Sequence, residues 1–179
     1  IINTTTTNLL TLGTATAAGI LAGTPSATNM VRGPFARTIA NANANTNYLL
    51  FPVGKTTYAP IWAAPATTAA TVMNAETFDT NTGTQSAAIA NMATNRRWEL
   101  PLVSGTINNI NVRLGDAGVL ATSIPVQAPS ASGEYTSTFG AVATAVVGVS
   151  TQSNTPVLSA SYTGYLSYAD SNACVGAPT

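Results

Sequence analysis

Short stretches in which apolar and polar residues alternate recur along this chain, and they constrain its fold more than any other feature. In the clearest stretch, Ile110, Val112 and Leu114 alternate with Asn111 and Arg113. A period of two residues is typical of a strand with one buried face. The same alternation, or enrichment in β-branched and aromatic residues, predicts further strands at residues 48–53, 57–62, 72–77, 97–103, 122–127, 135–139, 141–149 and 158–163.

Turn residues separate these stretches, as at Thr82-Gly83 and Ser104-Gly105. Many short strands spaced by about 8–12 residues predict an all-β fold, here an antiparallel β-sandwich of the Greek-key or jelly-roll kind. Helix signals are weak, because no stripe with a period of 3.6 residues is sustained. We expect at most one short helix, at residues 86–92.

The chain carries few charges for a globular protein. Charged residues make up 7% and apolar residues 45% of the sequence, and the formal net charge is zero. Disordered chains combine low hydrophobicity with high net charge, so a packed core is expected instead. A net charge near zero also favours association between copies.

Neither nucleic-acid binding nor a membrane-spanning helix is expected from this composition. Binding to nucleic acid needs a basic patch, and six basic residues are spread over the 179 positions. The longest apolar stretch, near residues 15–22, is much shorter than the roughly 18–20 residues of a membrane-spanning helix. We therefore expect no nucleic-acid partner and no membrane span.

Groups for catalysis or metal binding are scarce. The sequence has no His, one Cys and one Lys, which excludes a Ser-His-Asp triad. Glu76 with Glu99 or Asp79 could form the carboxylate pair of a glycosidase. We prefer the interpretation that these acids are solvated or paired with arginines. The loop at Asp116 has one acid, whereas calcium loops gather several oxygen ligands. We expect no enzyme activity, no cofactor and no metal site.

Changes in amino-acid composition along the sequence divide the chain into three parts. Residues 1–28 are rich in Thr and form a strand segment that completes a sheet, adds one rung to a solenoid or is donated to a neighbour. Residues 29–170 form the β-sandwich module, and residues 171–179 form a linker into a following module. Cys174 is a free thiol or one half of an intermodule disulfide. The chain begins at Ile1 without a Met, so we expect a processed or excised piece.

Three clusters stand out against the Thr- and Ala-rich background. They are V-R-G-P-F-A-R-T at residues 31–38, Y-L-L-F-P-V-G-K at 48–55 with Y-A-P-I at 58–61, and N-R-R-W-E at 95–99. Together they resemble a repeat module of very large secreted surface proteins of gliding and environmental Bacteroidetes. Those modules carry V-x-G-P-L-x-R-T, F-P-V-G-K…Y-x-P and N-R-Y-W stretches and a strand ending in R-L, which Arg113-Leu114 matches.

The resemblance covers roughly residues 9–179, and the F-P-V-G cluster is its most specific part. This chain has Phe35 where the family often has Leu, and Arg97 where it often has Tyr. The C-x-G-x-P run at residues 174–178 is similar to the start of the next module. The resemblance implies a secreted, extracellular cell-surface or filament-forming protein, exported through the type IX pathway. It implies adhesion or gliding roles, neighbouring copies or modules of the same protein as partners, and no catalytic residues.

We interpret the residues that carry the resemblance as structural. They are Arg32, Gly33, Pro34, Arg37, Phe51, Pro52, Val53, Gly54, Arg97 and Trp98. The aromatic and aliphatic members are expected in the core, together with Tyr58 and Ile61. Pro52 and Gly54 are expected to bracket a turn. The arginines are expected to pair with Glu76, Asp79 and Glu99 or to donate to backbone carbonyls.

A carbohydrate-binding β-sandwich module is the alternative function, with surface glycans as partners. Its stacking platform would come from Trp62, Trp98, Tyr58, Tyr162, Tyr165 and Tyr168. Trp98 is more plausible in the core, and Tyr165 and Tyr168 are three residues apart and cannot share one strand face.

Overall fold

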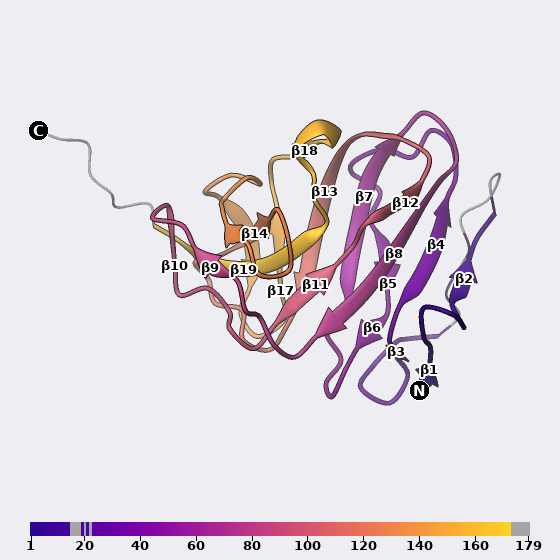
Figure 1. Cartoon of the computed structure of the whole chain (residues 1–179), viewed down its shortest axis with the longest axis horizontal. Coiled ribbons are helices and arrows are strands. Elements are labelled where there is room, and N and C mark those ends of the chain that lie inside the picture. Colours follow the sequence, from indigo (N-terminus) through magenta and orange to yellow (C-terminus); the bar gives the residue numbers. More distant parts are fainter. Residues whose placement is uncertain (15–18, 20, 22, 173–179) are drawn as a thin grey trace, which may run out of the picture.

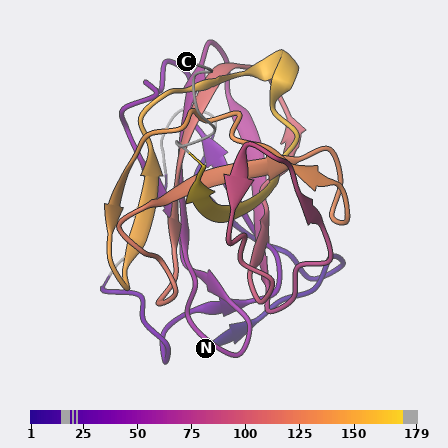
Figure 2. The same ribbon diagram turned by 90° about the vertical axis from the view of Figure 1, so that its left-hand side faces the viewer.

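The protein is an all-β sandwich in a computed structural model that describes residues 1–14, 19, 21 and 23–172. Two large sheets face each other, as the two perpendicular views show (Figure 1, Figure 2). This confirms the fold class expected from the alternating stretches. Among the described residues, no helix has the length and apolar character that a membrane crossing requires.

The larger sheet has eight strands, in the order β10-β19-β11-β8-β4-β2, with β12 paired to β8 and β14 paired to β19. Its strands are β2 (Leu10–Leu12), β4 (Phe35–Ile39), β8 (Thr71–Phe78), β10 (Ile89–Ala90), β11 (Arg97–Glu99), β12 (Leu102–Ser104), β14 (Ser123–Ala128) and β19 (Tyr165–Ser171). All its pairings are antiparallel except that of β2 with β4.

The six-stranded sheet has the order β16-β17-β13-β7-β5, with β18 also paired to β13, and is antiparallel throughout. Its strands are β5 (Leu49–Phe51), β7 (Ile61–Thr67), β13 (Ile107–Gly115), β16 (Ala143–Val146), β17 (Ser150–Ser153) and β18 (Val157–Leu158). The chain crosses repeatedly between the two sheets, as from β7 to β8 and from β12 to β13, and these crossings connect the two layers.

Two small sheets complete the structure. Parallel strands β1 (Ile2–Asn3), β3 (Val31–Arg32) and β6 (Val53–Gly54) form one, and parallel strands β9 (Thr84–Gln85) and β15 (Glu134–Tyr135) form the other. They lie at opposite sides of the molecule (Figure 1). Within residues 1–28, β1 therefore pairs with β3 and β2 pairs with β4 of the same chain. Cys174 and residues 173–179 lie outside the described residues.

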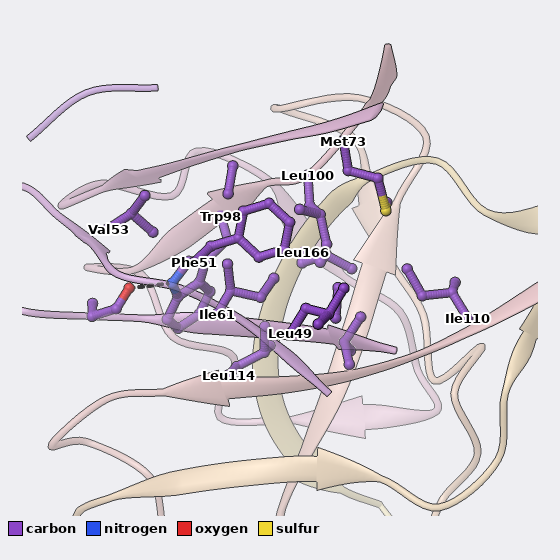
Figure 3. Packing of buried hydrophobic residues seen from close by; sticks show 14 of the residues in the cluster. Leu49, Phe51, Val53, Ile61, Met73, Trp98, Leu100, Ile110, Leu114 and Leu166 are labelled. Carbon is purple, nitrogen blue, oxygen red and sulfur yellow. Dashed lines mark hydrogen bonds between the residues drawn. The ribbon is translucent and has the colours of Figure 1, made fainter. Parts of the chain in front are cut away.

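The main core fills the space between the two large sheets. Inward residues of β8 and β7 are buried at every second position, as the alternation predicts. Trp98 is fully buried, and its indole Nε1 donates to the carbonyl of Ala59 at 2.8 Å (Figure 3). The rings of Phe35 and Phe51 meet edge to face with centroids 6.1 Å apart, a favoured aromatic geometry.

A second, smaller core lies against β14. All six residues of β14 are buried, so this strand is covered on both faces. Its Ile124 and Val126 pack with Ile89 and Tyr135, which come from the segments around β10 and β15. The loops between the main strands therefore form a third, partial layer on this side of the sandwich.

The helix expected at residues 86–92 is wrong. Ile89 instead pairs with Ser171 of β19 and is 1% exposed, so its burial against the sheet outweighs a weak local helix preference. The strand expected at 158–163 is also wrong beyond Leu158. That segment forms a single 3-10 turn, η1 (Ser159–Ser161), the one helical element of the described residues. Leu158 is 64% exposed, so the alternation there has no buried face to define a strand.

Candidate functional site

The first two sequence clusters lie side by side in the structure. Val31 is paired with Val53, and Arg32 with Gly54, across the parallel strands β3 and β6. The third cluster pairs with β8, where Arg97 lies opposite Phe78. All three clusters therefore meet near the end of β8, although they are far apart in the sequence.

The turn next to β6 contacts β8 directly. Lys55 Nζ lies 3.5 Å from Glu76 Oε1 and 5.5 Å from the centroid of the Phe78 ring. The guanidinium of Arg97 lies 4.1 Å from the same ring centroid and 2.9 Å from Glu99 Oε1. Two cations thus contact one aromatic ring, an arrangement that links the second and third clusters to β8.

The apolar residues of the clusters lie in the core. Phe51, Val53 and Trp98 are fully buried, whereas Tyr58 is half-buried. The turn expected between Pro52 and Gly54 is wrong, because Val53 and Gly54 form β6 and the bend follows at residues 55–57. Gly54 is required by packing rather than by an unusual φ, since a Cβ there would lie 2.4 Å from the carbonyl oxygen of Thr57.

The three motif arginines have different partners. Arg97 pairs with Glu99, as expected. Arg37 is buried and donates to the carbonyls of Leu50, at 2.7 Å, and Gly19, and burial lowers the pKa of its guanidinium. Arg32 is exposed and has no ion-pair partner among the described residues. The three motif arginines therefore have three different environments, and only Arg97 forms an ion pair.

Arg32 and Lys55 line a groove on the surface of the molecule. The groove has a volume of about 500 Å³ and is bordered by residues 4–6, by Arg32, Gly33 and Pro34, and by Lys55, Thr56 and Glu76. Hydroxyl groups and three charged side chains dominate its lining. Lys55 is paired with Glu76, so the free positive charge of this groove comes from Arg32.

A buried charge network lies beside these clusters, and its centre is Arg96. The guanidinium Nε donates to Asp116 Oδ2 at 2.5 Å, Nη1 pairs with Asp79, and Nη2 donates to Thr57 Oγ1 at 2.7 Å. Asp116 also accepts hydrogen bonds from the Tyr168 hydroxyl at 3.2 Å and from the Gly118 amide at 2.7 Å. We call Asp79, Arg96, Asp116 and Tyr168 the Arg96 network.

The electrostatics of the network follow from these contacts. Burial alone would raise the pKa of Asp79, but hydrogen bonds from Thr56 and the charge of Arg96 outweigh it and lower that pKa. Burial and the neighbouring Asp116 carboxylate raise the pKa of Tyr168. Asp79 is therefore held ionised and the Tyr168 phenol neutral. Sequence reasoning missed Arg96, because its acidic partners lie 17 and 20 residues away along the chain.

A different surface lies on the outer face of the six-stranded sheet. Strand register places Trp62, Arg113 and Gln152 in one row across β7, β13 and β17. The carbon at the centre of the Arg113 guanidinium lies 5.2 Å from the Tyr48 ring centroid and 5.6 Å from that of Trp62. A hollow of about 390 Å³ adjoins this row and is lined by Tyr48, Asn111 and other polar residues.

The stacking platform expected from six aromatic residues is not assembled. Trp98 and Tyr168 pack against each other in the core with ring centroids 6.2 Å apart. The Tyr162 hydroxyl donates to the carbonyl of Leu100 at 2.8 Å, and burial raises its pKa. Of the six, Trp62 lies in the outer row described above, where its aromatic neighbour is Tyr48 rather than any residue of the expected set.

The fold and these surfaces define a β-sandwich domain with an internal charge network. Comparisons with protein-family models, with curated proteins and with solved structures find no match for this chain. The resemblance to the Bacteroidetes surface modules therefore stays a prediction from the three sequence clusters.

Proposed function

We propose that the protein is a non-catalytic structural module or subunit of an extracellular bacterial filament or adhesin, contributing to adhesion or gliding-type motility. Its proposed partners are neighbouring copies or modules of the same protein. The three sequence clusters support the class. The observation that carries the proposal is the composition of the sheet edge formed by β16.

Strand β16 ends the six-stranded sheet and has β17 as its strand partner there. Four valines on and beside it are 53–68% exposed: Val142, Val146, Val147 and Val149. No charged residue occurs between Glu134 and Asp170 in the sequence. Most proteins protect an exposed edge with Lys, Pro or a bulge, and an apolar unprotected edge readily pairs with another strand.

The placement of charge elsewhere supports the same proposal. Seven charged side chains take part in four internal ion pairs, including those of the Arg96 network. Few charged side chains remain outside these pairs, so charge repulsion between copies is weak. A surface of this kind favours assembly with copies of the same module.

Sedimentation velocity over a range of protein concentrations tests the assembly. We expect the protein to self-associate and Val146→Lys to weaken that association at least about tenfold, because like charges would face each other across the joined edges. Val103→Lys is the matched control, since Val103 is 58% exposed on β12 of the other sheet. A monomeric wild-type protein, or equal effects of the two lysines, would overturn the role of β16.

Antibody labelling of intact producing cells tests the location. We expect an antibody against this domain to label unpermeabilised cells, and brief protease treatment of those cells to remove the label. Signal that depends on permeabilisation would contradict an extracellular role.

A further inference from the structure

We propose that the outer face of the six-stranded sheet binds a polysaccharide that carries carboxylate groups. Arg113 would bind the carboxylate, and Trp62 and Tyr48 would provide the surfaces against which sugar rings stack. We call Tyr48, Trp62, Asn111, Arg113, Gln152 and Asn154 the Arg113 face. The role of this polysaccharide as the adhesion target rests on the proposed function. Its binding, however, is measurable on the isolated protein.

The charge on this face has no partner of opposite sign. The four ion pairs of the described residues involve Lys55, Arg96 and Arg97 as cations and do not include Arg113. Arg113 is half-buried, so its charge is partly removed from water. A cation in that position gains from a carboxylate more than a fully solvated one does.

Gln152 orients the guanidinium without neutralising it. Arg113 Nε donates to Gln152 Oε1 at 2.7 Å, and Nη2 donates to the same oxygen. The remaining nitrogen, Nη1, has no hydrogen-bond partner among the described residues. Arg113 therefore presents a free donor edge whose direction is set by a neutral neighbour, which suits the planar recognition of a carboxylate.

The two aromatic rings flank this cation. The centre of the guanidinium lies within 5.6 Å of both ring centroids, and both aromatic side chains are half-buried. A Cβ at Gly115 would lie 3.1 Å from Cζ3 of Trp62, so this part of the indole lies close to the backbone of Gly115. Trp62 is only partly buried, and its exposed part offers an apolar surface beside Arg113 on which a pyranose ring can pack.

The amide groups beside the rings match the hydroxyls of a sugar. Asn111, Gln152 and Asn154 line the hollow of about 390 Å³ together with Tyr48. The Thr144 hydroxyl donates to Asn154 Oδ1 at 2.9 Å, and the Asn154 amide nitrogen has no partner among the described residues. A few convergent polar groups at the edge of an aromatic surface are typical of sites that orient a small ligand.

The expected ligand is a sugar acid rather than a nucleic acid. The cross-strand row through Arg113 carries no second cation, as its neighbours are Trp62 and Gln152. One cation supplies little of the phosphate neutralisation on which nucleic-acid binding depends. A polysaccharide that carries one carboxylate on each sugar ring matches this arrangement, because the face offers one arginine between two aromatic rings.

Isothermal titration calorimetry with oligogalacturonate, a chain of carboxylated sugars, tests the proposal. Its fully methyl-esterified form is the matched ligand control, because it keeps the rings and removes the charge. We expect the acid to bind at least about tenfold more tightly than the ester, as a charge-assisted hydrogen bond is lost. Equal binding of the two forms, or no binding of the acid at millimolar concentration, would overturn the proposal.

Variants locate the site. Arg113→Gln and Trp62→Ala are each expected to weaken binding at least about tenfold. Arg32→Gln is the control, since Arg32 is also an arginine without an ion-pair partner among the described residues but is exposed and lies in the groove near β3. This substitution should change the affinity for the acid less than about twofold. A loss with Arg32→Gln equal to that with Arg113→Gln would place binding elsewhere and overturn the proposal.

A third measurement does not depend on the variants folding. In NMR titrations of the wild-type protein, the indole N–H of Trp62 should shift with the acid, while the indole N–H of buried Trp98 should not. Shifts confined to other regions would overturn the proposal. If no binding is found but the protein self-associates and is labelled on cells, the proposed ligand is wrong and the proposed structural role stands. If binding is found but the protein neither self-associates nor is labelled on cells, the proposed structural role alone is wrong.

Discussion

The Arg96 network and the β16 edge differ in the side chains from which they are built. The network consists of charged and polar groups, whereas the edge is apolar. The network joins acidic, basic and phenolic side chains that come from distant parts of the chain, and Arg96 and Asp116 are 7% and 8% exposed. The β16 edge has exposed valines and no ionisable side chain. The scarce charges therefore hold the inside of the module together, and the outside edge is left apolar and available for contact.

Arg96→Met is expected to have the largest effect on stability. It would leave the Asp116 carboxylate buried without its cation, and breaking such a buried pair costs about 3–5 kcal/mol. Denaturant titration would measure the loss. Arg32→Met, at an exposed position, should change the free energy of unfolding by less than about 0.5 kcal/mol. Similar values for the two variants would show that the network does not stabilise the fold.

Alkaline pH is expected to have the next largest effect. Burial raises the pKa of Tyr58 and Tyr135 to about 12 and also raises that of Tyr168. The unfolded chain then loses its phenolic protons first, near pH 10, so stability is complete below that pH and falls above it. Thermal unfolding between pH 8 and 12 would measure this decline, and Tyr135→Phe should make it shallower. An unchanged slope in that variant would contradict the assignment.

Acid pH is expected to have the smallest of the three effects. The pKa of Asp79 is lowered in the folded state, so the unfolded chain binds a proton first as the pH falls. Stability is therefore complete above about pH 4 and is lost below it. Asp79→Asn should weaken this dependence in denaturant titrations at pH 2–6. Because β16 has no ionisable group, association through that edge should not vary between pH 5 and 9.

Strands with clear alternation were predictable because alternation is a local property, whereas β4 and β19 were not expected and the strand expected at 135–139 ends at Tyr135. The expected strand at 72–77 is the centre of β8, and the alternation of Ile110, Val112 and Leu114 lies within β13. The same reasoning failed at 158–163, where small residues alternate without a sheet face to cover. It also failed at 86–92, where pairing with β19 replaced the expected helix.

The candidate sites were less predictable because they depend on which strands become neighbours. The role of Trp98 as a core residue followed from its type and its context, and it is fully buried. Arg113 was noticed in the alternating stretch and as part of the R-L pair, but its position between Tyr48 and Trp62 depends on the register of β5, β7 and β13. Strand register is set by long-range pairing, which composition and spacing do not report.

Local chemistry along the chain was enough to establish an all-β module with few charges and no histidine. Burial of alternate residues drives strand formation at each stretch independently, so this level of structure is readable one segment at a time. The meeting of Arg96 with Asp79 and Asp116, and the exposure of β16 at an edge, arise when two sheets pack and their strands take an order. Those contacts join residues that are far apart in the sequence, and they are determined by how the whole chain packs.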